Sequence, residues 1–244
     1  MKLLHIDIET APHLAAVWGM YDQNVGIDQL MEPGYTLCWS AKWHGSREIM
    51  FSSILDGKRR MIRKAHKLLD EADAVCHYNG TKFDIPTLNK EFLLYGLSPP
   101  SPVKQIDLLR TARSRFRLAS NKLDFVAQQL GLGSKTKHKG FSMWLGCMNK
   151  DEASWRVMEK YNKQDVLLLE KVYNRLMPWI TGHPNRSVMD DTFCCPKCTS
   201  KKYQQRGTCI TAAGRYRRYQ CQNCGNWFRL NLREPSQKTK ALTI

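Results

Sequence analysis

Four acidic residues in the sequence lie in settings that suit catalysis, and the first two are Asp7 and Glu9. They are two positions apart in LLHIDIE, a segment whose apolar residues predict a buried strand. Because side chains alternate between the faces of a strand, both carboxylates are expected to project the same way. Acids beside buried apolar residues need compensation from water, cations or metal, and a solvated strand end is the alternative.

The other two acids are Asp84 and Asp165. Asp84 precedes a predicted helix that has Pro86 near its first turn, so helix capping is an alternative role for this residue. Asp165 lies four positions after Tyr161 in a long predicted helix, which puts both side chains on one face. The alternative for this pair is an exposed polar face.

Four carboxylates held close together predict a metal site. Each pair repels by about 4 kcal/mol at a separation of roughly 4 Å and an effective dielectric constant near 20, unless cations neutralise the charge. Two divalent ions would offset four negative charges, and hard carboxylate oxygens suit Mg²⁺ or Mn²⁺. Such an ion pair can activate a water and stabilise the departing oxygen in phosphoryl transfer.

The order of these motifs resembles one family of nucleases. Asp7-x-Glu9, then Phe83-Asp84, then Tyr161-x3-Asp165 are similar to the motifs of the DEDD exonucleases of the tyrosine subclass. The resemblance covers roughly residues 1 to 177. The stretch FRLASNKLDFVAQQLGLG is also similar to the proofreading domain of family B DNA polymerases and its stand-alone, phage-type relatives. The resemblance implies a ribonuclease-H-like α/β fold, a mixed sheet flanked by helices, and a 3′-to-5′ exonuclease acting on single-stranded DNA ends.

The resemblance also implies a role for each motif residue. Asp7 would bridge two Mg²⁺ or Mn²⁺ ions, and Glu9 and Asp165 would complete the site of the attacking water. Asp84 would support the second ion. Tyr161 would orient the nucleophile, because a phenol with a pKa near 10 suits hydrogen bonding better than proton abstraction at pH 7.

Other residues near these motifs receive weaker assignments. Asn79 resembles a substrate-contacting asparagine of the family, although an Asn-Gly turn is a reasonable alternative. His77 is read as structural, and Asp107 as a strand-end residue that binds nothing. Trp18 and Tyr21 lie in an insertion, residues 11 to 34, that we expect to form a lid or a short helix.

A second metal site is predicted near the end of the sequence. Cys195-x2-Cys198 and Cys221-x2-Cys224 are separated by 22 residues, slightly more than a common zinc-ribbon spacing, and the two pairs predict a zinc ribbon that binds one Zn²⁺. Cys194 could replace Cys195 as a ligand. The nine cysteines are an odd number in a chain without an export signal, which argues against a disulfide framework.

The predicted ribbon carries residues that suit nucleic-acid binding. Arg215, Arg217 and Arg218 alternate with Tyr216 in GRYRRYQC, and Trp227 follows the second cysteine pair. Arginines can contact phosphates while aromatic rings stack on bases. The alternatives are a ribbon whose aromatic residues form its core and whose arginines are solvated, or a ribbon that holds a protein partner.

The overall charge agrees with a polyanionic partner. The 244 residues include 38 Lys or Arg and 22 Asp or Glu, a formal net charge of +16. The sequence has neither an apolar run of membrane-spanning length nor a signal peptide. We therefore expect no membrane partner and a cytoplasmic protein, in the host cytoplasm if it is phage-encoded.

The chain is expected to contain four segments. These are an exonuclease domain (1–180), a linker (181–191), a zinc ribbon (192–233) and a basic tail (234–244). Within the first, hydrophobic periodicity predicts strands at 3–9, 35–43, 48–53, 73–79 and 103–109, and helices at 58–72, 85–96, 108–116, 123–131 and 151–176.

Several functions remain open at this level. The same two-metal chemistry would serve an RNA exonuclease or a structure-specific endonuclease, and a DNA polymerase could be a partner. A non-catalytic nucleic-acid-binding scaffold is the alternative from a different class, and the complete set of motif residues argues against it.

Overall fold

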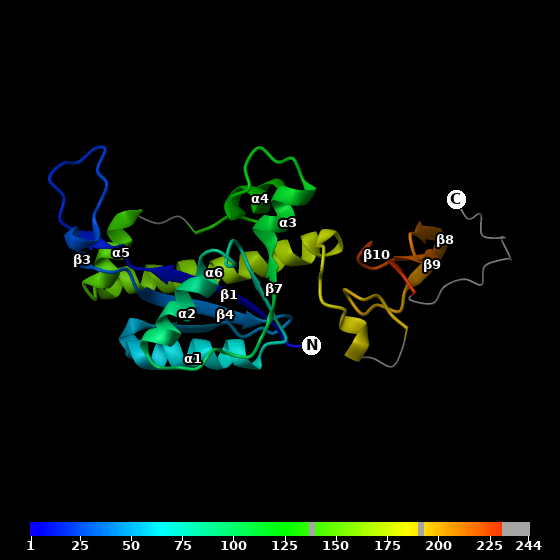
Figure 1. The fold of residues 1–244 in the computed structure, drawn as a ribbon, viewed down its shortest axis with the longest axis horizontal. Helices are drawn as coiled ribbons and strands as arrows, with labels where there is room; N and C mark the ends of the chain where they lie inside the picture. Colours follow the sequence, from blue (N-terminus) through cyan, green and yellow to red (C-terminus); the bar gives the residue numbers. More distant parts are fainter. Residues whose placement is uncertain (137–139, 190–192, 231–244) are drawn as a thin grey trace. The chain divides into compact units, whose positions relative to one another are not determined.

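The chain forms two compact units, Met1–Asn174 and a second that begins at Arg175 (Figure 1). The structure is a computed structural model that describes residues 1–136, 140–189 and 193–230. The predicted basic tail at 234–244 lies outside the described residues, as do the ends of the predicted ribbon and part of the predicted linker. No helix in the described ranges combines the length and apolarity needed to cross a membrane.

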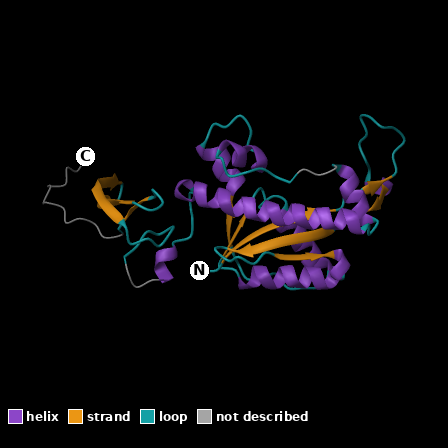
Figure 2. Cartoon of the chain, turned by 180° about the vertical axis from the view of Figure 1, so that it is seen from behind, coloured by secondary structure: helices purple, strands orange, loops and turns teal. Residues whose placement is uncertain are grey.

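A five-stranded mixed sheet forms the centre of the first unit (Figure 2). Its strands, in spatial order, are β5 (Met50–Ser53), β4 (Thr36–Trp43), β1 (Leu3–Thr10), β6 (Ala74–His77) and β7 (Lys104–Asp107). The first three pair antiparallel, and β6 and β7 extend the sheet in parallel with β1. All five correspond to strands that the hydrophobic pattern predicts.

Helices cover both faces of this sheet, so the predicted mixed sheet flanked by helices is confirmed (Figure 2). On one face Leu4, Ile6 and Ile8 of β1 share a core with α1 (Lys58–Glu71) and α2 (Asp84–Leu94). Helix α1 buries Met61, Ile62, Ala65 and Leu69, a helical spacing that leaves all its arginines and lysines except the half-buried Lys58 exposed.

The opposite face of β1 packs against the long helix α6 (Glu152–Leu176). His5, Asp7 and Glu9 alternate with the core residues of β1 and therefore point toward this helix. Helix α6 buries residues on both of its sides, from Trp155 to Leu176. The polar residues of the candidate site thus sit between a central strand and a well-anchored helix.

Three shorter helices complete the first unit. They are α3 (Leu108–Arg115), α4 (Leu123–Gln129) and α5 (Phe141–Met148). The sequence pattern predicts the first two but misses α5. Its sequence, FSMWLGCM, has one polar residue and an internal glycine, so no amphipathic period marks it as a helix.

The insertion after β1 is a small ribbon and not a helix. Strands β2 (Leu14–Ala15) and β3 (Leu30–Glu32) pair antiparallel, and a 3₁₀ turn, Ile27–Gln29, precedes β3. The side chains of Trp18 and Tyr21 at its tip are 99% and 86% exposed. Closure of this segment over a substrate stays a prediction.

The second unit contains a three-stranded antiparallel sheet in the order β10-β9-β8. Its strands are β8 (Tyr203–Thr211), β9 (Gly214–Cys221) and β10 (Trp227–Arg229). Phe193, Tyr203, Tyr219 and Phe228 contact one another through their rings. This aromatic cluster is small, so packing alone gives the unit limited stability.

Candidate active site and zinc site

Three of the four predicted acidic residues meet in one cluster. One carboxylate oxygen from each of Asp7, Glu9 and Asp165 lies within 4.8 Å of the others. Asp7 and Glu9 are half-buried on β1, whereas Asp165 on α6 is 1% exposed. The alternation along β1 therefore brings its two acids against the helix face that carries the third.

Asp84 lies beside this cluster but outside the group of three. It is buried at the start of α2, where its Oδ1 accepts a hydrogen bond from the backbone N–H of Ile8 at 3.1 Å. Its side chain does not cap α2, whose preceding residue is Phe83. Its negative charge contributes to raising the pKa of both Asp7 and Glu9, so it belongs to the same electrostatic site.

Burial is the first cause of the altered acidity of all four carboxyl groups. It raises the pKa of Glu9 to about 8 and that of Asp84 to about 7. The pKa values of Asp7 and Asp165 are also raised, by burial first and, at Asp7, by the neighbouring acids as well. Desolvation and mutual repulsion both disfavour the charged forms of these carboxyl groups.

Lys135 enters this site although the sequence analysis overlooks it. Its Nζ donates to Asp165 Oδ2 at 2.5 Å and to the Tyr161 hydroxyl at 3.2 Å. Burial is the largest single influence on Lys135 and lowers its pKa, but the charges of Asp165, Tyr161 and Asp7 and the hydrogen bond to Asp165 together outweigh it, so the pKa is raised. The ammonium group is therefore a cation that offsets part of the carboxylate charge.

Asn162 is a second residue of the site that the sequence motifs do not identify. It is fully buried on α6, and its Nδ2 donates to Asp7 Oδ2 at 2.7 Å and to the Asp7 carbonyl at 3.3 Å. It lies three positions before Asp165, on the same helix face, which is the signal that could have identified it. Asn162 fixes the orientation of the Asp7 carboxylate.

The cluster fits a divalent metal ion. Asp165 Oδ1 is buried and has no hydrogen-bond partner among the described residues, so a carboxylate oxygen is left to be satisfied. The donor set of Asp7, Glu9 and Asp165 consists of hard oxygens, which Mg²⁺ and Mn²⁺ prefer over softer metal ions. These residues could hold such an ion, with Asp84 adjacent to it.

The raised pKa values predict that metal binding strengthens with pH. A carboxyl group whose pKa is higher in the folded chain than in the unfolded chain stabilises the fold at pH values below the unfolded pKa. For Glu9 this contribution is lost as the pH rises through its folded pKa of about 8. Metal ions displace these protons, so affinity for Mn²⁺ should rise by about tenfold per pH unit for each proton released. Calorimetric titration between pH 6 and 8 would measure this, and a flat affinity would contradict it.

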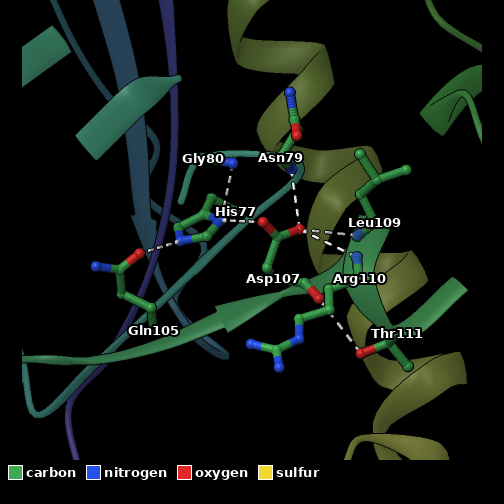
Figure 3. Close-up of polar contacts among 8 residues, drawn as sticks. All are labelled: His77, Asn79, Gly80, Gln105, Asp107, Leu109, Arg110 and Thr111. Carbon is green, nitrogen blue, oxygen red and sulfur yellow. Dashed lines mark hydrogen bonds and ion pairs between the residues drawn. The ribbon is translucent and has the colours of Figure 1, made fainter. Parts of the chain in front are cut away.

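Asp107 holds together the turn beside the candidate site (Figure 3). Its Oδ1 accepts hydrogen bonds from the backbone N–H groups of Asn79 at 3.0 Å, Leu109 at 3.0 Å and Arg110 at 3.3 Å. It thereby caps α3 and anchors the turn after β6. The predicted strand-end position is confirmed, because β7 ends at Asp107, and from there the carboxylate also satisfies free N–H groups of the helix that follows.

His77 is buried next to this turn and is neutral. Its Nδ1 accepts from the Gly80 N–H at 3.1 Å, so its Nε2 carries the proton and donates to Gln105 Oε1 at 3.2 Å (Figure 3). Burial lowers the pKa of His77. Its 3.8 Å approach to Asp107 is therefore not an ion pair. These contacts agree with the structural role expected for His77.

Asn79 occupies the position of the turn that requires a left-handed backbone. Its φ is 71°, a conformation that asparagine adopts more readily than most residues. The turn therefore explains an asparagine here, as the alternative interpretation expects, and substrate contact by Asn79 stays a prediction.

Loss of the Asp107 carboxylate is expected to destabilise the first unit. Asp107→Ala would leave the N–H groups of Asn79, Leu109 and Arg110 without their acceptor, at a cost of about 1 to 3 kcal/mol. Urea unfolding followed by tryptophan fluorescence would measure the change. Asp28→Ala, at an exposed position in the insertion, is the control, and equal stability of the two variants would contradict this role.

A cleft of about 660 Å³ opens beside the carboxylate cluster. Asp7 and Lys135 from the cluster line it, together with Tyr78, Arg113 and Lys122. Its positive side chains would attract a polyanion toward the acids. The cleft thus places lysine and arginine side chains next to a group of candidate metal ligands.

Comparison with known proteins identifies the superfamily. The family model of the RNase H superfamily matches residues 4–177, which contain all four acids and Tyr161. The chain belongs to the RNase H superfamily. The ribonuclease-H-like fold expected from the resemblance is therefore confirmed.

Solved structures show the same fold. The RNase H domain is similar to the family B DNA polymerase from the hyperthermophilic archaeon Pyrobaculum calidifontis, with a TM-score of 0.53 and 18% sequence identity. The match covers 72% of this chain and 24% of the polymerase chain, so it spans only about a quarter of that enzyme's length. No curated protein matches the sequence.

Beyond the residues matched to the RNase H superfamily, four cysteines form a second cluster. Cys195 Sγ lies 3.7 Å from Cys224 Sγ, and Cys198 Sγ lies 3.6 Å from Cys221 Sγ. Tetrahedral zinc with Zn–S bonds of about 2.3 Å separates its ligands by roughly 3.75 Å. A disulfide would need about 2.05 Å, so these separations fit a zinc site and not a bridge.

The surroundings of the four thiols also fit a zinc ion. Asn223 Nδ2 lies 3.7 Å from Cys198 Sγ, and Asn226 Nδ2 lies 3.9 Å from Cys195 Sγ, so both amides can donate to thiolates. Cys194 is buried outside the group of four. The arrangement therefore favours Cys195 over Cys194 as a ligand.

The predicted nucleic-acid contacts on the second unit differ in exposure. Arg215, Arg217 and Arg218 are exposed, and Trp227 is 47% exposed with Arg218 over its ring. Tyr216 is instead buried, with Arg229 stacked on it at 3.9 Å. Tyr216 therefore agrees with the alternative of an aromatic core, whereas the side chains of the other four are exposed.

Proposed function

We propose that this protein is a metal-dependent 3′-to-5′ exonuclease that acts on single-stranded DNA ends. The observation that carries the proposal is the convergence of the Asp7, Glu9 and Asp165 carboxylates beside a cation-lined cleft. A nuclease needs metal ligands next to a surface that attracts phosphates, and the cleft supplies both. The polarity and the choice of DNA rest on the resemblance to the DEDD exonucleases.

Each side chain of the site has a separate proposed role in hydrolysis. Asp7, Glu9, Asp84 and Asp165 would hold two Mg²⁺ or Mn²⁺ ions. When bound, these ions would polarise the attacking water and stabilise the departing oxygen. Asn162 holds Asp7 in position, and Lys135 is close enough to Asp165 to meet a phosphate brought to the cluster.

Tyr161 fits the role of orienting the nucleophile. Burial, followed by the charge of Asp165, raises its pKa, so its hydroxyl stays protonated at pH 7 and acts through hydrogen bonding. The hydroxyl already lies 3.2 Å from Lys135 Nζ, within the site.

The Tyr161→Phe variant is expected to lower the rate of hydrolysis by about 10- to 100-fold. This corresponds to the loss of one oriented hydrogen bond in the transition state, about 1.4 to 2.7 kcal/mol. Single-turnover cleavage of a labelled oligonucleotide would measure it, with Tyr35→Phe as the control on the same unit. An unchanged rate would remove Tyr161 from the mechanism.

The walls of the cleft are proposed to hold the substrate strand. Arg113 and Lys122 would contact its phosphates, and the Tyr78 ring offers a surface for a base. Tyr78 is fixed by a 2.7 Å hydrogen bond from its hydroxyl to the carbonyl of Asn121. Such contacts do not distinguish one base from another, which suits an enzyme that removes any terminal nucleotide.

The second unit is proposed to bind one Zn²⁺ through its four clustered cysteines and to assist nucleic-acid binding. Its exposed arginines can contact phosphates, and Trp227 can stack on a base. Such a unit could assist a nuclease that works alone or beside a separate DNA polymerase.

Digestion of 5′-labelled single-stranded DNA tests the proposal. We expect a ladder that shortens from the 3′ end in Mg²⁺ or Mn²⁺ and none in EDTA. A phosphorothioate at the 3′ end should block it, and circular DNA should stay intact. The same assay with RNA decides the preferred sugar. Cutting of circles would replace the proposal with an endonuclease, and intact substrates in every metal would favour a binding scaffold.

A further inference from the structure

A third cluster of side chains that could bind a metal ion lies farther along the contact between β1 and α6. It consists of His5 on β1, His44 immediately after β4 and Glu170 on α6. His5 precedes Asp7 by two positions and shares its face of the strand, but its neighbours here are a second imidazole and a different acid. The three residues lie far apart in the sequence, so no motif with a fixed spacing identifies them.

The separations of the ligand atoms fit one tetrahedral ion. His5 Nε2 lies 3.2 Å from His44 Nδ1, and His44 Nδ1 lies 3.4 Å from Glu170 Oε1. Zinc bonds of about 2.0 to 2.2 Å to nitrogen and oxygen place tetrahedral ligands roughly 3.3 to 3.5 Å apart. One ligand atom from each of the three residues lies within 4.8 Å of the others.

Hydrogen bonding satisfies this arrangement poorly. His44 Nδ1 takes part in both contacts, so a single proton on it would have to serve His5 Nε2 and Glu170 Oε1 at once. If that proton sits on His5 instead, the lone pair of His44 faces a carboxylate. A cation between the three atoms satisfies all of them.

The environment of the cluster resembles that of a metal site. Gly45 N–H donates to Glu170 Oε1 at 2.8 Å, and Lys42 forms an ion pair with Glu170 Oε2, so the carboxylate is held in place. The Tyr173 ring packs edge-on against the two imidazoles, at centroid distances of 5.3 and 5.1 Å. These contacts orient the ligands before any ion binds.

Burial of the cluster leaves one side open. His5 is fully buried, whereas the side chains of His44 and Glu170 are 20% and 14% exposed. An ion could therefore enter from the side of His44 and keep a water as its fourth ligand.

We propose that His5, His44 and Glu170 bind one divalent transition-metal ion, with Zn²⁺ the expected ion. Two imidazole nitrogens and one carboxylate are a donor set that zinc prefers and that Mg²⁺ avoids. The ion would fasten β1 and the end of β4 to α6, the helix that carries Tyr161 and Asp165. It is separate from the all-oxygen cluster and from the four cysteines.

Counting zinc in matched variants of the full chain tests the proposal. Each variant would be equilibrated with Zn²⁺, dialysed and measured by mass spectrometry for bound metal. We expect Glu170→Gln and His44→Ala each to hold one zinc fewer than the unchanged chain. Cys198→Ser removes a ligand of the cysteine site, and combining it with Glu170→Gln should give additive losses of zinc. Asp165→Asn removes a ligand of the carboxylate cluster, and Glu170→Gln should cause the same loss of zinc in its presence. His66→Ala, on α1, is the control and should leave the count unchanged.

Cobalt spectra assign the ion to its site. Co²⁺ bound to four cysteines has a thiolate charge-transfer band, which Glu170→Gln should retain, whereas the weaker bands of a nitrogen and oxygen site should be lost. Added Zn²⁺ should also raise the melting temperature of Cys198→Ser but not that of Cys198→Ser combined with Glu170→Gln. Equal zinc content in the unchanged chain and in Glu170→Gln would overturn the proposal, as would an equal zinc-induced shift in melting temperature for Cys198→Ser with and without Glu170→Gln. The contact between His5 and His44 would then be a hydrogen bond between the two imidazoles.

Discussion

The Asp7→Asn variant is expected to lose hydrolysis by at least about a thousand-fold while it still binds single-stranded DNA. A carboxylate oxygen of Asp7 lies in the group of three and accepts a hydrogen bond from the Asn162 amide, so the substitution removes a proposed metal ligand. A thousand-fold change corresponds to about 4 kcal/mol of transition-state stabilisation, a modest share of what a bound metal ion supplies. Single-turnover cleavage and a filter-binding assay would measure the two properties separately.

Two comparisons make this result specific to the site. Asp28→Asn removes the same charge from an exposed position and should leave cleavage unchanged. Asp165→Asn should match the loss caused by Asp7→Asn, because both acids serve one cluster. Substantial cleavage by the Asp7→Asn chain would mean that hydrolysis does not depend on these carboxylates.

Removal of zinc is expected to unfold the second unit and leave the first intact. The aromatic cluster around Tyr203, Tyr219 and Phe228 is too small to hold so short a chain by packing alone. Structural zinc binding contributes about 10 to 16 kcal/mol at pH 7, so its loss exceeds any stability that remains. Amide resonances of residues 193 to 230 should collapse to unfolded positions after chelation, while those of the first unit stay dispersed.

Single cysteine variants test which thiols hold the ion. Cys195→Ser and Cys198→Ser should reproduce the effect of chelation, whereas Cys194→Ser and Cys209→Ser should not, because neither lies in the group of four. A folded second unit in the Cys195→Ser chain together with an unfolded one in Cys194→Ser would assign the ligand to Cys194.

The sequence predicts the sheet and the acids of the site because both depend on local patterns. Alternation along LLHIDIE places Asp7 and Glu9 on one face, and helical spacing joins Tyr161 to Asp165. The covering helices α1 and α6 are similarly amphipathic. Where the pattern is absent, as in the almost wholly apolar α5, the helix escapes prediction.

The residues that complete the site could not be predicted because contacts between distant segments define them. Lys135 contacts Asp165 from a loop thirty positions away. Asp107 accepts a hydrogen bond from Asn79, which lies in the turn after β6. Neither belongs to a recognisable motif. The pairing of His5 and His44 with Glu170 is likewise visible only once β1, β4 and α6 are assembled.

Counting Mn²⁺ ions by electron paramagnetic resonance tests the central claim most directly. With the cysteine cluster filled with zinc, the unchanged chain at pH 8 should bind two Mn²⁺ and cleave single-stranded DNA in proportion to their occupancy. The Asp7→Asn chain should bind fewer ions and lose cleavage. Cleavage that persists without bound Mn²⁺ or Mg²⁺, or tight Mn²⁺ binding that Asp7→Asn leaves unchanged, would contradict a metal-dependent nuclease at these carboxylates.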